Sequence, residues 1–181
     1  MHQVQENDQA LLQNHSTVTS AATTHSNTPQ VPPNVLFVGS FDAGTRQGED
    51  ESAAFVIRHI SGDIIAAKAT RYTACSDPYV LEALALRDCL VHCTQAQLQN
   101  IHIQGDAKVI LDKCRAGDTC DSKIGILLQE IVLLLQVLSS VSLQFVGRLN
   151  NRVAHSVAKH ALGLSPRQIA RFDYVAWLRS R

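Results

Sequence analysis

The sequence predicts an α/β domain in which helices flank a mixed β-sheet. Between about residues 35 and 72, hydrophobic side chains recur with a period of two, as is typical of consecutive strands. After residue 77, helical patterns alternate with two short apolar segments. Because no helix separates the first three strands, we expect them to form an antiparallel meander. The two later strands each follow a helix, so they should join the same sheet in parallel.

Residues 1–33 differ in composition from the rest of the chain. They are rich in Gln, Asn, Ser, Thr and His, and they contain no Lys or Arg, the first of which is Arg46. A transit peptide would be rich in arginine and poor in acidic residues, whereas this segment contains Glu6 and Asp8. Pro32-Pro33 marks its end. The predicted organisation is a disordered polar tail (1–33), a folded domain (34–163) and a basic helical arm (164–181).

Turn and cap residues divide the folded domain into elements. The first strand should end at Asp42, with residues 42–51 as a loop, and Ser61-Gly62-Asp63 should join the next two strands. Asp77 is a good N-cap and is followed by proline, which is tolerated in a first helical turn. Asp121 or Ser122 should cap a later helix. The expected strands span 35–41, 53–60, 64–72, 100–104 and 141–146, and the expected helices 77–96, 106–115, 122–138 and 150–162, before an arm that Ser165-Pro166 opens.

Charge is unevenly distributed along the chain. Of the 16 basic residues seven lie after Gln144, but of the 16 acidic residues only Asp173 does. A basic C-terminal end is compatible with contacts to phosphates, and a solvated helical surface would explain it equally well. No apolar run reaches the roughly 18–20 residues of a membrane span, and the most apolar stretch, residues 124–138, is predicted to be a buried amphipathic helix.

The cysteine content indicates a reducing compartment. The chain has five cysteines, which is an odd number, and no Cys-x-x-Cys motif. We therefore expect reduced thiols in a nuclear or cytosolic protein, without a zinc site. The five residues are Cys75, Cys89, Cys93, Cys114 and Cys120.

Three carboxylates stand where structure alone does not favour them. Asp42 ends an apolar strand, Glu82 lies in the first turns of an apolar helix, and Asp106 follows the glycine that ends the fourth predicted strand. Each has an ordinary explanation: a turn acid, a favourable partner for the helix dipole, and an N-cap. Clustered carboxylates repel one another unless a cation lies among them, and hard oxygen ligands suit Mg²⁺ or Mn²⁺. The three together favour a metal site over three separate explanations.

Several sequence blocks resemble the plant RNase H-like family, the type 1 domains related to the RNase H part of retroelement polymerases. The resemblance covers about residues 35–162 and rests on blocks at 41–44, 54–58, 61–67, 82–87, 104–110 and 148–158. It implies a five-stranded mixed sheet and two Mg²⁺ or Mn²⁺ ions that hydrolyse the RNA strand of an RNA–DNA hybrid. It also implies that Asp42 bridges the ions, that Asp106 holds one, and that Glu82 holds one and helps to recognise the 2′-hydroxyl.

The sequence departs from the family pattern at the fourth acidic position, which is His155. A neutral imidazole is a poor Mg²⁺ ligand, so His155 is expected either to order water or shuttle a proton, or to be a surface histidine. The mobile histidine of active members corresponds to Phe145, and the following proline to Gly147. A second proton-handling group is therefore missing.

By the same correspondence, the predicted nucleic-acid-binding residues are Ser40, Arg148 and Asn151, and Arg148 and Asn151 could instead orient the helix that carries His155. The basic loop with which some relatives grip the hybrid is absent, because Lys123 is the only basic residue between Arg115 and Gln144. Affinity for the nucleic-acid backbone should then be low unless the basic arm replaces the loop.

Three functions remain open from the sequence. The first is a ribonuclease H endonuclease, and the second is a catalytically weak nucleic-acid-binding module. The third is a protein-interaction domain that uses the arm, although packing of the arm against the domain would explain the same aromatic residues. Those residues are Phe172, Tyr174 and Trp177.

Overall fold

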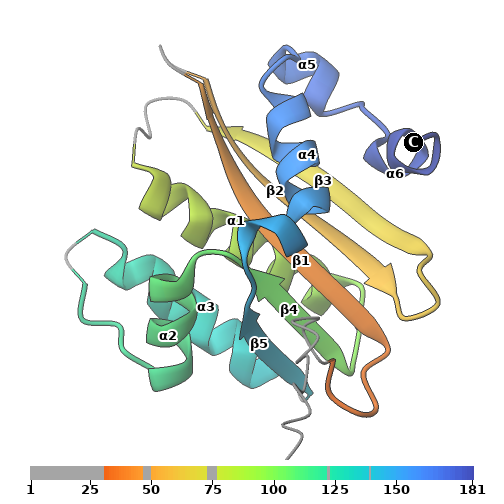
Figure 1. The fold of residues 1–181 in the computed structure, drawn as a ribbon. Helices are drawn as coiled ribbons and strands as arrows, with labels where there is room; N and C mark the ends of the chain where they lie inside the picture. Colours follow the sequence, from red (N-terminus) through yellow and green to blue (C-terminus); the bar gives the residue numbers. More distant parts are fainter. Residues whose placement is uncertain (1–30, 47–49, 73–76, 122, 139) are drawn as a thin grey trace, which may run out of the picture.

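A computed structural model of the chain describes residues 31–46, 50–72, 77–121, 123–138 and 140–181. Its centre is a five-stranded sheet in the order β3-β2-β1-β4-β5 (Figure 1). β1 pairs with β2 and β2 with β3 in antiparallel fashion, whereas β4 lies parallel to both β1 and β5. The predicted mixed sheet with an initial meander is thereby confirmed. The strands are β1 (Phe37–Arg46), β2 (Asp50–His59), β3 (Ile64–Tyr72), β4 (Ile101–Gly105) and β5 (Val141–Phe145).

Strand β1 is longer than the sequence predicts. The residues after Asp42 were expected to form a loop, but β1 continues to Arg46, and β2 already begins at Asp50. The prediction was wrong because pairing with β2 continues to the last residue of β1, Arg46, which lies opposite the first residue of β2, Asp50. Asp42 therefore sits inside a strand and not at its end, and it is only 4% exposed.

Helices cover both faces of the sheet (Figure 1). Successive residues of β2 alternate between the two faces, as expected of a strand buried on both sides. Phe55 and Ile57 join the core under α1, α2 and α3, and Ala54 and Val56 join the core under α4, α5 and α6. The helices are α1 (Pro78–Gln95), α2 (Lys108–Ala116), α3 (Gly125–Val137), the 3-10 turn η1 (Arg148–Asn150), α4 (Arg152–Ala161), α5 (Pro166–Ile169) and α6 (Tyr174–Arg179).

The predicted helix caps at Asp77 and Ser165 are confirmed. The Asp77 carboxylate accepts a hydrogen bond of 3.0 Å from the Tyr79 backbone N–H. Ser165 forms a reciprocal capping box with Gln168. Helix α3 begins only at Gly125, although Asp121 does accept from two backbone N–H groups in the turn before it.

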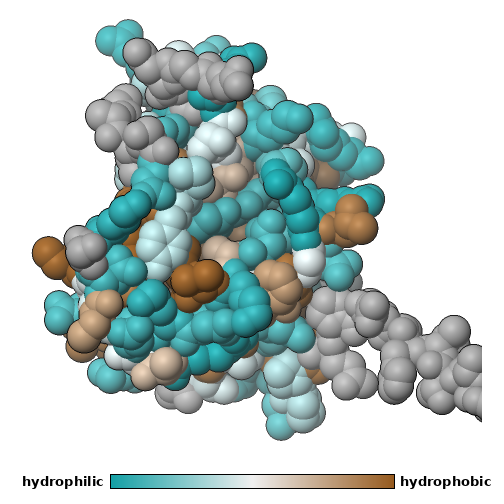
Figure 2. Space-filling model, turned by 60° about the vertical axis from the view of Figure 1, so that its left-hand side comes forward, coloured by the Kyte–Doolittle hydropathy of each residue, from teal (hydrophilic) through white to brown (hydrophobic). Residues whose placement is uncertain are grey.

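Helix α3 is also less buried than the sequence predicts. Leu128 and Ile131 lie in the core, but Ile126, Leu133 and Val137 are exposed. None of the described helices is both long and apolar enough to cross a membrane. In the view of Figure 2, hydrophobic side chains are scattered among hydrophilic ones, without one continuous patch.

The C-terminal arm packs onto the domain. Tyr174 is 2% exposed, and the His160 ring of α4 stacks on the Trp177 indole at 4.4 Å between centroids. The Arg179 guanidinium donates a 3.0 Å hydrogen bond to the carbonyl of Ile64 at the start of β3. The aromatic residues therefore cover the domain, as one of the two sequence interpretations holds, and do not form a partner-facing patch.

The cysteines that the structure describes are not paired with one another. Cys89, Cys93 and Cys114 are buried, and Cys120 is exposed. Cys75, Ser122 and residues 1–30 of the predicted tail lie outside the described residues.

Candidate active site

Asp42, Glu82 and Asp106 meet at one place on the sheet. Each offers a carboxylate oxygen, and these oxygens all lie within 4.8 Å of one another. The topology explains the meeting, because β1 and β4 are adjacent and parallel, with Ser40 opposite Gln104, so that the side chains two residues further along emerge side by side. Glu82 completes the group from α1, which packs directly against β1.

Gly105 permits the close contact between β1 and β4 just before Asp106. A Cβ atom at this glycine would lie 2.4 Å from the ring of Phe41, which fills the space and is fully buried. Only a residue without a side chain fits there. Phe41 on β1 thus packs against Gly105 of β4. Asp42, the next residue of β1, lies near Asp106, the residue that follows β4.

The cluster is electrostatically strained in the absence of a cation. Burial, followed by repulsion from Asp42 and Asp106, raises the pKa of Glu82 to about 9. Burial also raises the pKa of Asp42, and a hydrogen bond from His155 opposes this shift. The Oε2 atom of Glu82 is buried and has no hydrogen-bond partner among the described residues. A divalent cation would supply both the missing charge and a partner for this oxygen, so the residues present fit a metal.

Asn151 holds Asp106 in place by a hydrogen bond. Its amide Nδ2 donates hydrogen bonds of 2.8 Å to the carbonyl of Phe41 and to Oδ1 of Asp106. The side chain is 1% exposed, and its own Oδ1 has no partner among the described residues. The sequence left open whether Asn151 contacts nucleic acid or orients the helix of His155, and the structure places its amide against Asp106, which it orients.

His155 faces the cluster from α4. Its Nδ1 lies 2.7 Å from Oδ2 of Asp42, and its side chain is 33% exposed. The alternative of a histidine that faces only solvent therefore does not hold. When Asp42 is ionised, Nδ1 is the donor of this bond, and Nε2 remains available to water or substrate.

Two other predicted positions lie at different depths. Ser40 is 2% exposed, and its hydroxyl accepts a 3.1 Å hydrogen bond from the amide of Gln104, which speaks against direct contact with a nucleic acid. Arg148 is exposed in η1, beside the cluster. The exposed cations Arg46 and Lys159 line the same groove as Arg148. Lys159 belongs to the basic C-terminal end that the sequence analysis singled out, whereas Arg46 was missed because residues 42–51 were assigned to a loop.

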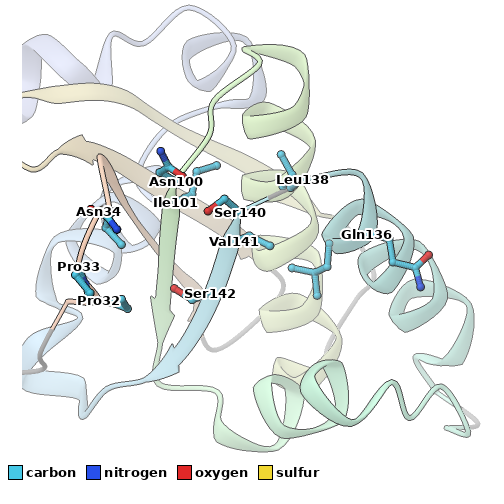
Figure 3. Close-up of a pocket in the computed structure, with 12 residues that line it drawn as sticks. Pro32, Pro33, Asn34, Asn100, Ile101, Gln136, Leu138, Ser140, Val141 and Ser142 are labelled. Atoms are coloured by element: carbon cyan, nitrogen blue, oxygen red, sulfur yellow. The ribbon is translucent and has the colours of Figure 1, made fainter.

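A cavity of about 640 Å³ lies away from the carboxylates. It lies at the other end of β4 and β5, and Figure 3 shows Pro32 and Pro33 on one side and Leu138 and Gln136 on the other. All its lining residues are uncharged. It therefore offers no acidic ligands for a metal ion.

A family model described as reverse transcriptase-like matches residues 39–161, which include all three acids. The chain belongs to the reverse transcriptase-like family. Among curated protein sequences, none matches it significantly.

Solved structures share the fold of this reverse transcriptase-like domain. RNase H1 from the halophilic archaeon Halobacterium salinarum has a TM-score of 0.64 at 21% identity, covering 70% of this chain and 97% of that one. LC11-RNase H1, isolated from compost, has a TM-score of 0.62 at 14% identity, covering 72% and 96%. The complex of LC11-RNase H1 with an RNA/DNA hybrid has a TM-score of 0.58 at 14% identity, covering 67% and 92%.

Proposed function

We propose that this reverse transcriptase-like domain is a ribonuclease H, which hydrolyses the RNA strand of RNA–DNA hybrids with divalent metal ions. One observation carries the proposal: carboxylates from β1, α1 and β4 converge, and one of their oxygens is buried and unpartnered. Such a cluster raises the free energy of the folded protein, so its presence points to a functional role. Metal-dependent phosphodiester hydrolysis is the role that matches its donor set and the family.

We further propose that the site holds two ions, Mg²⁺ or Mn²⁺. Asp42 would bridge them, and Glu82 and Asp106 would each hold one. Bound there, the ions would supply Lewis acidity and neutralise charge at the phosphate, the two-metal arrangement for in-line displacement. Asn151 fixes the orientation of Asp106, and His155 fixes that of Asp42 while its Nε2 is free to hold a water molecule.

The proposed substrate class follows from the same site. Members of the fold have been seen on an RNA/DNA hybrid, among them LC11-RNase H1 and a foamy viral protease-reverse transcriptase. Glu82 is only partly buried, and its carboxylate could accept a hydrogen bond from a 2′-hydroxyl, the group that separates RNA from DNA. We propose that Arg148 contributes to binding of the strand from the exposed turn η1.

A second candidate is a nucleic-acid-binding module with little or no turnover. The observation that favours it is His155, which stands beside Asp42 without adding the negative charge that a fourth carboxylate would bring. Under this alternative, the hybrid would bind in a salt-dependent manner but would not be cut.

A cleavage assay separates the two candidates. A labelled RNA–DNA hybrid is incubated with the protein in Mg²⁺ or in Mn²⁺, and the RNA fragments are resolved by length. We expect internal cuts in the RNA strand that Asp42→Asn abolishes and that the exposed control Asp63→Asn does not. A folded wild-type protein that binds the hybrid but cuts it in neither metal would establish the binding module instead.

The motifs also suggest an origin. We propose that the domain descends from the RNase H of a retroelement and that it is one of the plant RNase H-like proteins. The family match supports the first part, since it concerns reverse transcriptase-like proteins.

A further inference from the structure

A groove of about 390 Å³ lies beside the carboxylate cluster, between the end of β1 and helix α4. Residues 43–46 line one side, and Arg148, His155 and Lys159 line the other. His155 belongs to both places, because it lines the groove and also bonds Asp42. The groove therefore continues directly from the carboxylates.

The groove is lined by three cationic side chains and by no acidic one: Arg46, Arg148 and Lys159. All three are exposed, and none of them pairs with an acidic residue that the structure describes. Elsewhere on the surface, cations such as Lys108 and Lys123 are paired with aspartates. Unpaired cations that converge on one groove create a positive potential that attracts an anion.

The packing of α4 on β1 sets the width of the groove. A Cβ atom at Gly44 would lie 2.7 Å from the Ser52 hydroxyl and 3.1 Å from the carbonyl oxygen of Ala158 on α4. The Ser52 hydroxyl in turn donates a 2.8 Å hydrogen bond to that carbonyl. The contact holds the helix that carries Lys159 against the strand that carries Arg46. The two cations are thus positioned by the fold.

We infer that this groove binds a backbone phosphate of the strand being cut, next to the phosphate that the carboxylates handle. The inference rests on the proposed function, which places one phosphate of that strand at Asp42. Successive phosphates of one strand advance by only about 3.4 Å along a duplex axis, so the following ones pass over the neighbouring surface. Such contacts set affinity and register without reading sequence.

This groove also answers a question that the sequence raises. Between Arg115 and Gln144 the only basic residue is Lys123, and it is paired with Asp77 at 2.8 Å. The α2–α3 side of the domain therefore has no free cation among its described residues between those two positions. The groove on the α4 side instead supplies the positive charge that binds the nucleic-acid backbone.

The salt dependence of binding tests the inference. Affinity for a short labelled RNA–DNA hybrid is measured by fluorescence anisotropy in EDTA over a series of salt concentrations. We expect Arg46→Gln and Lys159→Gln each to lower affinity and to reduce the slope of log affinity against log salt by about 1, and the double variant by about 2. Arg58→Gln and Lys68→Gln are the matched controls, because these cations lie on β2 and β3 outside the groove.

The outcomes separate this inference from the proposed function, because cleavage is measured on its own in Mg²⁺. A double variant that keeps the slope and affinity of the controls overturns the groove, whether or not the wild type cuts the hybrid. Loss of slope in a protein whose wild type does not cut supports the groove and removes the ribonuclease. A wild type that does not bind the hybrid at all overturns both. Thermal unfolding of each variant, monitored by circular dichroism, verifies that these substitutions leave the fold intact.

Discussion

The imidazole Nδ1 of His155 lies 2.7 Å from Oδ2 of Asp42, across 113 residues of sequence. This bond joins the helix on one face of the sheet to the central strand at the most buried of the three acids. It also contributes a downward influence on the pKa of Asp42, against the upward effect of burial. His155 therefore tunes the ligand set without belonging to it.

Replacement of His155 by aspartate should convert the site into one with four acids. We expect His155→Asp to raise the affinity for Mg²⁺ by about tenfold, equal to about 1.4 kcal/mol, because a fourth negative charge attracts the cation. Isothermal titration calorimetry with Mg²⁺ measures this change. His155→Asn keeps a hydrogen-bonding group without the charge and should leave the affinity near that of the wild type. A His155→Asp protein that bound Mg²⁺ no better than His155→Asn would contradict the prediction.

Removal of the Asn151 amide should weaken both the fold and the site. Asn151→Ala leaves the buried carbonyl of Phe41 without its donor and frees Asp106. We expect a loss of about 1–3 kcal/mol in the free energy of unfolding, measured in urea, together with slower cleavage of the hybrid. Asn151→Asp is the informative comparison, since it keeps the shape but sets a carboxylate against Asp106. It should be the worse of the two at neutral pH and should recover as the pH is lowered.

In the metal-free protein, Glu82 should make stability depend on pH. Its pKa in the folded state is about 9, above the ordinary value of 4.5, so the folded protein holds a proton that the unfolded chain releases. The free energy of unfolding should therefore fall as the pH rises from about 4.5 through 9. Glu82→Gln removes this slope, and at neutral pH it should be the more stable protein by about 3 kcal/mol in EDTA.

Urea denaturation at several pH values in EDTA measures this effect, and saturating Mg²⁺ is its control. With Mg²⁺ the wild type should become the more stable of the two proteins. The metal binds and stabilises the wild type, whereas Glu82→Gln lacks one of the metal ligands. Equal slopes for the two proteins in EDTA would show that Glu82 is not protonated in the folded state.

Addition of one methyl group at Gly105 should be costly. The Cβ atom of Gly105→Ala would fall 2.4 Å from the Phe41 ring, and either this ring or β4 has to move. We expect a loss of about 1–3 kcal/mol by thermal or urea unfolding and a larger proportional loss of cleavage, since Asp106 moves with the strand. Gly147→Ala is the matched control, because nothing lies within 4 Å of a Cβ there. If both substitutions cost the same, the packing argument is wrong.

The order of elements was predictable from the sequence because local signals and the fold agree. Alternation gave the three early strands, and Asp77 followed by proline gave the start of α1. The length of β1 was not predictable, because residues 43–46 include a glycine and polar side chains that are typical of a loop. Their strand conformation depends on pairing with β2, which is a tertiary contact. The exposed face of α3 was missed for a related reason, since its apolar residues do not reveal which of them meet the sheet.

The candidate site was predictable as far as its charges go. Each of the three acids lies in an apolar setting that a lone carboxylate avoids, and this signal is local. The supporting arrangements are not local: Asn151 donates a hydrogen bond to Asp106 across 45 residues, and Arg46 and Lys159 line one groove because Gly44 lets α4 approach β1. No pattern along the chain records such pairs. Charge and polarity along the sequence thus identified the three candidate metal ligands. The residues that position these ligands could be identified only from the fold.

The arm has a practical consequence for anyone who would work with a shorter fragment. The family match ends at residue 161, which invites a truncation just after α4. Yet Tyr174 closes the core over Ala67 on β3, and Arg179 is bonded to the start of that strand. β3 is an edge strand, and removal of its cover would leave an apolar surface beside open backbone groups, the usual setting for aggregation. The segment that matches the family is therefore shorter than the segment that packs together as the folded domain.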